Sequence, residues 1–110
     1  MKATETEHLE ILGVRARVAR RLGDRMKGLI GCRDLPPGEG LLITSCRAIH
    51  TCFMCMAIDA TFLDRHGRVV RTVRNIRPWR LFVWGGFRAV QVLETRAGAV
   101  AGSPKGPFKD

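Results

Sequence analysis

The chain has 110 residues, a length that fits one domain with a single buried core. Hydrophobic residues make up 45% of it, which is typical of a globular rather than a disordered protein. Lys and Arg number 19 against 10 Asp and Glu, giving a formal net charge of +9. This charge favours an acidic protein, nucleic acid or an anionic surface as partner, although it also serves solubility alone.

The distribution of apolar residues argues against a membrane protein. No run approaches the roughly 20 apolar residues that a transmembrane helix requires. The first eight residues carry acidic side chains and lack the apolar region of a secretory signal. We therefore expect a cytoplasmic protein without a transmembrane segment, whose cysteines are reduced thiols rather than disulfides.

The first third of the chain predicts one strand and one helix. Residues 1–8 are polar and we expect them to be flexible. Leu9–Val18 alternates between apolar and polar positions, which predicts a strand with one buried face. From Val18 to Ile30 the period changes to that of a helix, and glycines follow where the helix would end. The apolar stripe of this helix consists of Val18, Leu22, Met26 and Leu29.

The remaining elements are strands and turns. Leu35–Gly40 is rich in Pro and Gly, which predicts a turn, and the apolar Leu41–Ser45 predicts a short strand. Strands at 60–63 and 68–73 flank Asp64–Gly67, where Asp can accept hydrogen bonds within a turn and Gly can adopt a positive φ. This pattern predicts a β-hairpin.

Aromatic residues dominate the segment after Pro78. Trp79–Phe87 is interpreted as a loop or short edge segment, Ala89–Glu94 as a strand, and Arg96–Gly98 as a turn. Residues 101–110 are expected to form a flexible tail. Together the elements predict a single domain over residues 1–110 of the α+β class. Its sheet would be mostly antiparallel and barrel-like, with one short helix near the N-terminus.

Several ordered blocks of sequence resemble one protein family, DUF192. The blocks are Gly28-Leu29, Leu35–Leu41, Ile49–Thr51, Met54, Ile58-Asp59, Phe62–Asp64, Gly67–Val70, Asn75–Trp79, Val92–Glu94 and Ala97-Gly98. The resemblance covers roughly residues 10 to 100. It implies a small, mostly β domain with a helix near its start, and it implies no reaction. Cys52 and Cys55 depart from the family pattern, so any cysteine chemistry would be peculiar to this chain.

Zinc-type donors lie close together in one stretch of the sequence, at Cys46, His50, Cys52 and Cys55. A structural zinc site has four such ligands in tetrahedral geometry and usually draws a second pair from a dozen or more residues away. Here all four crowd into ten residues, so they are weak metal candidates. A redox-active Cys-x-x-Cys motif requires a helix N-terminus, which lowers the pKa of its thiol, and the sequence does not indicate a helix at this position. We expect buried, inert thiols and no cofactor.

The second candidate site is a polar ligand pocket made by His50, Thr51, Asp59 and Glu94. In such a pocket the histidine would act as a general base or as a ligand, oriented by a carboxylate. The alternative is structural: His50 would hydrogen-bond to the backbone at a strand end, and Asp59 would cap a turn.

The third candidate site is a series of arginines at every third position from Arg65 to Arg80, followed by aromatic residues. Period three matches neither helix nor strand, which argues against a single stripe. Even so, arginines beside aromatic rings suit the binding of phosphates and the stacking of bases. Plain solvated arginines, or an aromatic flap that packs over the fold, are the alternatives. The candidates for contact with an anionic partner are Arg68, Arg71, Arg74, Arg77, Trp79, Arg80 and Trp84.

We therefore expect a binding or accessory module, not an enzyme, that engages an acidic or anionic partner through its Arg-rich edge and aromatic loop. One alternative is a small-ligand-binding protein or enzyme with a pocket centred on His50, Asp59 and Glu94. A second alternative is a zinc-supported domain.

Overall fold

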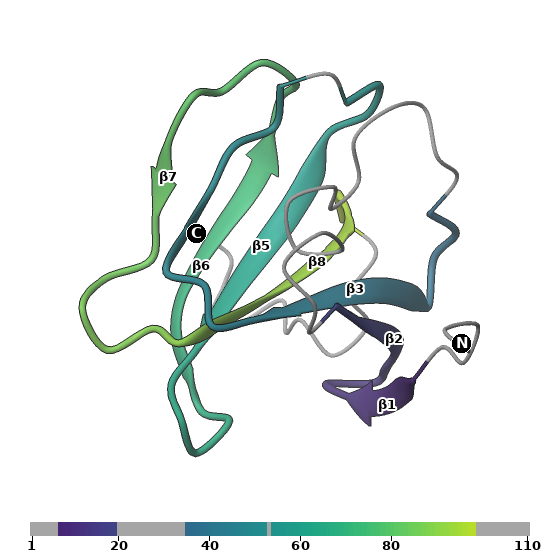
Figure 1. The fold of residues 1–110 in the computed structure, drawn as a ribbon. Helices are drawn as coiled ribbons and strands as arrows, with labels where there is room; N and C mark the ends of the chain where they lie inside the picture. Colours follow the sequence, from purple (N-terminus) through teal and green to yellow (C-terminus); the bar gives the residue numbers. More distant parts are fainter. Residues whose placement is uncertain (1–6, 20–34, 53, 99–110) are drawn as a thin grey trace, which may run out of the picture.

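The computed structural model of the chain describes residues 7–19, 35–52 and 54–98. Within these ranges the chain forms eight β-strands (Figure 1). They are β1 (His8–Ile11), β2 (Val14–Ala19), β3 (Glu39–Thr44), β4 (Ala48–Ile49), β5 (Ile58–Leu63), β6 (Val69–Ile76), β7 (Val83–Trp84) and β8 (Gln91–Arg96).

Six of the strands form one open, mixed sheet in the order β1-β2-β3-β8-β5-β6. β2 pairs with β3 in parallel, and the other neighbours are antiparallel. β4 and β7 form a separate two-stranded ribbon. The prediction of an α+β fold with a barrel-like sheet is wrong, since the described residues contain no helix and their sheet does not close. They contain no helix long and apolar enough to cross a membrane either.

The predicted helix does not begin at Val18. Val18 and Ala19 belong to β2, where they pair with Leu42 and Ile43 of β3. Val14, Ala16 and Val18 are all buried, so the period of two that starts at Val14 continues through Val18. The rest of the predicted helix, from residue 20 onward, lies outside the described residues.

The N-terminal strand prediction missed a turn. Instead of one strand over Leu9–Val18, the chain forms a hairpin of β1 and β2 joined at Leu12-Gly13. Leu12 has a φ of 54° and Gly13 a φ of 77°, the left-handed pair that a two-residue hairpin turn needs. Leucine rarely adopts this conformation, so the turn could not be recognised from the residue types at these two positions.

The hairpin of β5 and β6 is confirmed. Asp64 Oδ1 accepts hydrogen bonds from the backbone N–H of His66 at 2.8 Å and of Arg68 at 2.9 Å. Gly67 has a φ of 80°, as the turn requires. The hydrogen bond from Arg68 lowers the pKa of the Asp64 carboxyl, because it favours the charged form.

Both faces of the central strands are buried. One face holds the larger hydrophobic cluster, in which Phe62 and Val92 pack with Val83 of the β4–β7 ribbon. The other face holds a smaller cluster that includes Val14, Leu42 and Leu93. All six residues of β5 are buried, including the polar Asp59 and Thr61, so both faces of this strand are covered.

Gly85 follows β7 and lies directly against the ring of Phe62. A Cβ atom at residue 85 would overlap the Cγ, Cδ1 and Cε1 atoms of Phe62, which is a fully buried side chain. Glycine therefore allows the chain after the ribbon to approach the sheet this closely.

We predict that Gly85→Ala destabilises the fold by about 1 to 3 kcal/mol, the usual cost of overpacking a core. The free energy of unfolding in urea measures this. Gly38→Ala is the matched control, because a Cβ at residue 38 meets no atom within 4 Å and only its positive φ adds strain. A Gly85→Ala variant as stable as the unmodified protein would contradict the tight contact between Gly85 and Phe62.

Candidate functional site

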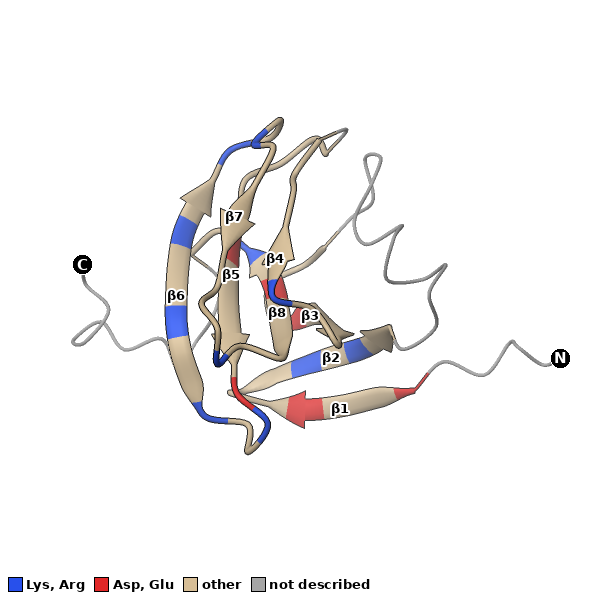
Figure 2. Ribbon diagram, turned by 60° about the vertical axis from the view of Figure 1, so that its left-hand side comes forward, with Lys and Arg blue, Asp and Glu red and all other residues tan. Residues whose placement is uncertain are grey.

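Arginines follow one edge of the sheet. β6 is an edge strand, and Figure 2 shows basic residues along it and in the loops at both of its ends. We call this set the arginine edge: Arg65, Arg68, Arg71, Arg74, Arg77 and Arg80. All of them are exposed except Arg74, whose side chain is 29% exposed. The edge contains every arginine that was predicted to meet an anionic partner.

Two bulges in β6 change how its side chains are distributed. The pairing with β5 shifts between Ile58 and Ala60 and again between Phe62 and Leu63. At each shift β6 carries one residue more than β5, so its side chains do not simply alternate between the faces. An argument from strict alternation therefore does not apply to Arg71 and Arg74.

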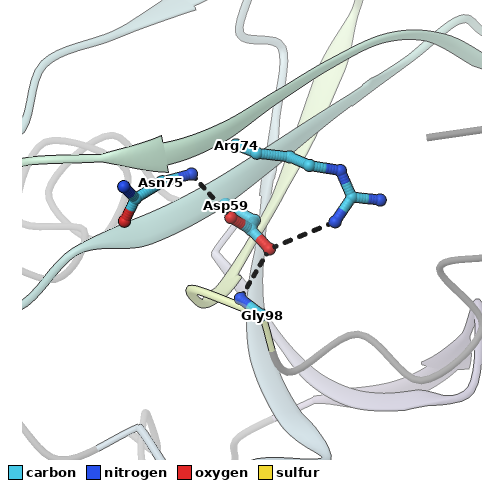
Figure 3. A network of polar contacts seen from close by, with 4 residues as sticks. All are labelled: Asp59, Arg74, Asn75 and Gly98. Carbon is cyan, nitrogen blue, oxygen red and sulfur yellow. Dashed lines mark hydrogen bonds and ion pairs between the residues drawn. The ribbon is translucent and has the colours of Figure 1, made fainter. Parts of the chain in front are cut away.

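Asp59 stabilises the first of these bulges. Its side chain is buried, and Oδ1 accepts a hydrogen bond from the backbone N–H of Asn75 at 2.8 Å. Oδ2 accepts one from Gly98 at 2.9 Å and lies 3.9 Å from a guanidinium nitrogen of Arg74 (Figure 3). Asn75 has a φ of 52°, so the bulge holds a non-glycine residue in the left-handed region. Asp59 thus joins β6 to the turn after β8.

The three residues at the centre of the predicted polar pocket, His50, Asp59 and Glu94, do not lie together in the structure. Asp59 pairs with Thr95, while Glu94 pairs with Ala60. Because neighbouring residues in a strand point to opposite faces, the carboxylates of Asp59 and Glu94 lie on opposite sides of the sheet. His50 is exposed, and its Nδ1 accepts a hydrogen bond from the backbone N–H of Cys52 at 3.1 Å. The three side chains therefore cannot act on one ligand.

Thr51, the fourth residue of that predicted pocket, connects two loops. It is fully buried, and its hydroxyl donates to the carbonyl of Arg77 at 2.6 Å and accepts from the N–H of Arg80 at 2.9 Å. Its backbone N–H donates to the carbonyl of Arg80, and its carbonyl accepts from Trp79. Trp79 has a φ of 69°, so Thr51 holds the turn at 77–80 in a conformation that tryptophan rarely adopts.

We expect Thr51→Val to lower the free energy of unfolding by about 2 kcal/mol, since it leaves a carbonyl and an N–H without their hydroxyl partner. Thr51→Ser keeps the hydroxyl and should lose much less. Urea unfolding of both variants measures the difference. A Val variant as stable as the Ser variant would show that the hydroxyl does not hold the turn.

Glu94 is an isolated acid in the core. It lies on the same face as its cross-strand neighbours Leu41 and Ala60, in the larger hydrophobic cluster. Its carboxyl is buried, and its Oε1 has no hydrogen-bond partner within the described part of the chain. Burial raises the pKa of Glu94 from 4.5 to about 8, because the charged form loses its hydration. The side chain is therefore largely protonated at neutral pH.

This raised pKa predicts a pH dependence of stability. Between pH 4.5 and about 8 the folded state holds a proton on Glu94 that the unfolded state releases. Stability should consequently fall as the pH rises through this range, by up to about 1.4 kcal/mol per pH unit. In Glu94→Gln this slope should disappear. Urea unfolding at several pH values tests it, and parallel pH profiles for the two proteins would contradict the buried, protonated acid.

The cysteines do not form the predicted constellation. Cys46 and Cys52 carry reduced thiols, whereas Cys55 takes part in a disulfide, so the expectation of reduced thiols is wrong for Cys55. The Sγ of Cys46 donates a hydrogen bond to the carbonyl of Ala48 at 3.0 Å. Among residues 7–19, 35–52 and 54–98, no three His, Cys, Asp or Glu side chains are placed to hold a metal ion.

A pocket of about 410 Å³ lies between β6 and the loop after β7. We call it the arginine–aromatic pocket, and its lining residues are Val70, Arg71, Trp84, Gly85, Gly86, Phe87 and Arg88. The ring of Trp84 packs edge-on against Phe87 with centroids 5.1 Å apart, and stacks with Phe82 at 6.1 Å. The sequence pointed to Arg71 and Trp84, but not to Arg88, which lies outside the series of arginines. The Gly85-Gly86 pair was the available signal for a close approach of the backbone.

The comparisons with known proteins identify the family. DUF192, described as "Uncharacterized ACR", matches residues 3–103, so the chain belongs to this family, as its sequence blocks indicated. No curated protein matches the chain.

Two solved structures are similar to the chain, and each is 21% identical to it, a level at which the similarity shows the fold alone. One is a protein of unknown function from Novosphingobium aromaticivorans, with a TM-score of 0.71 over 77% of this chain and 64% of that one. The match thus spans less than two thirds of that protein. The other, from Sinorhizobium meliloti, is called a "putative transcription regulator" and has a TM-score of 0.72 over 79% and 71% of the two chains.

Proposed function

We propose that the protein is a non-enzymatic binding or accessory module that engages an anionic partner through the arginine edge and the aromatic segment beside it. The observation that carries the proposal is the arginine–aromatic pocket, in which Arg71 and Arg88 lie beside Trp84 and Phe87. Arg71 belongs to both the pocket and the edge, so a ligand in the pocket would continue onto a row of cationic side chains.

The distribution of charge supports this proposal. The buried acids Asp59 and Glu94 lie inside the sheet, and Glu10 lies on β1 at the opposite edge. Figure 2 shows basic residues along β6 and in the loops at its ends. The acids beside them are Asp59, which pairs with Arg74, and Asp64 in the hairpin turn. A surface with one predominant sign of charge raises the local concentration of an oppositely charged partner and speeds its association.

Arginines on an edge strand also have a simpler use, since they prevent edge-to-edge pairing with another sheet. That use does not require aromatic side chains in the solvent. Yet Leu81 and Phe87 are 80% and 83% exposed, and Phe82 is 63% exposed. A cluster of exposed apolar side chains of this kind is typical of an interaction site, which favours binding over edge protection alone.

The proposal is tested by NMR titration of the ¹⁵N-labelled protein with three anionic probes: an oligonucleotide, polyglutamate and vesicles containing phosphatidylserine. We expect at least one probe to shift the resonances of residues 68–88. The double variant Arg68→Glu, Arg77→Glu should weaken this binding by roughly tenfold or more, because two cationic contacts are replaced by repulsion.

The matched control is Arg15→Glu, Arg17→Glu on β2, which makes the same change in net charge away from β6. It should weaken binding much less than the edge variant does. The proposal fails if no probe shifts residues 68–88, or if the control variant loses as much affinity as the edge variant.

A further inference from the structure

We infer that the arginine–aromatic pocket binds one nucleotide unit of a single-stranded nucleic acid. The base would stack on the rings of Trp84 and Phe87, and the phosphate would lie between Arg71 and Arg88. This inference rests on the proposed function, since it specifies the anionic partner and the place where it is held.

The size of the pocket fits this ligand. Its volume of about 410 Å³ lies within the range of roughly 300 to 1,000 Å³ that small-molecule sites occupy. The volume of a single nucleotide is at the lower end of that range. A folded protein that docks on this surface would not require a concave site.

The ring of Trp84 is held in place by its neighbours. Trp84 packs against two neighbouring rings, parallel to Phe82 and edge-on to Phe87. Gly85, the next residue, is pressed against the buried ring of Phe62. Because the tryptophan and its backbone are held in this way, stacking a base on the indole loses little side-chain entropy. Every base offers a π-face, so such a site would tolerate different sequences.

The two arginines come from different elements. Arg71 lies on β6, where it pairs with Phe62 of β5, and Arg88 lies in the loop after β7. Guanidinium groups bind phosphate oxygens through two parallel N–H bonds, and contact from two sides would define the position of one phosphate. β6 spans about 26 Å over its eight residues, and the exposed Arg68 and Arg77 lie directly before and after it, where they would meet the neighbouring phosphates.

The combination of rings and arginines favours a single strand over the other anions. An acidic peptide would satisfy the arginines but leave the rings of Trp84 and Phe87 in water. A duplex keeps its bases stacked inside, and exposing one costs a few kcal/mol. An anionic membrane would take up the protruding Leu81, Phe82 and Phe87, but it would make no use of the pocket that Trp84 lines. A nucleotide with an unpaired base uses both parts of the pocket.

The test compares four probes at one salt concentration: an oligothymidylate, a duplex of equal charge, polyglutamate and phosphatidylserine vesicles. Binding is followed by tryptophan fluorescence and calorimetry. The oligothymidylate should bind at least about tenfold more tightly than the duplex, since only its bases can stack. Trp84→Ala should weaken its binding by about 5- to 150-fold and leave duplex and polyglutamate binding nearly unchanged. Trp84→Phe should retain most of the affinity.

Two further variants keep the test decisive should Trp84→Ala fold poorly. Phe87 is 83% exposed, so Phe87→Ala should fold normally and still lose single-strand affinity. Arg88→Ala should reduce the slope of log K against log salt by about 0.7, the value for one phosphate contact on a single strand. Arg15→Ala, on β2, should leave that slope unchanged.

The outcomes separate the two proposals. If the duplex, polyglutamate or vesicles bind as tightly as the oligothymidylate at residues 68–88, the nucleotide inference is overturned while the proposed function stands. Equal weakening of all probes by Phe87→Ala would overturn it too. If no probe binds, both proposals fail.

Discussion

The contact between Gly85 and Phe62 determines the geometry of the whole candidate surface. Phe62 is the largest fully buried side chain; it lies on the central strand β5 and pairs directly with Arg71 of β6. Gly85 brings the chain after β7 onto the same ring. One buried phenyl group thereby sets the separation between an edge strand and a loop that is distant in sequence. The pocket exists because this separation leaves room for Arg71, Trp84 and Phe87 around it.

Buried polar groups hold the neighbouring segments in place. Thr51 satisfies the backbone of the turn at 77–80, and Asp59 satisfies Asn75 and Gly98. Each links two segments that meet only in the folded chain, and each supports a residue with a positive φ, Trp79 or Asn75. Glu94 differs, because it is buried without such a partner at Oε1. The polar residues that sequence analysis grouped as one site thus have separate roles.

Features set by local chemistry could be predicted from the sequence, and features set by pairing could not. The turn at Asp64–Gly67 is encoded in a few neighbouring residues, and it was found. The turn at Leu12-Gly13 has only one conformationally permissive residue, and it was missed. Asp59 and Glu94 were predicted to share a pocket, but the faces on which they lie depend on the register between β5 and β8. The bulges in β6, and hence the directions of its arginines, depend on pairing in the same way.

The position of the arginines on an edge strand has a consequence for how this fold can change in evolution. β6 has an unpaired outer edge within the described sheet, and cationic side chains keep such an edge from joining other chains. A change in sequence that removed the aromatic ring beside Arg71 would leave this protective role of the arginines intact. Positive charge along β6 is therefore explained by edge protection alone, and the proposed binding function depends on its association with an aromatic ring, as at Arg71 and Trp84.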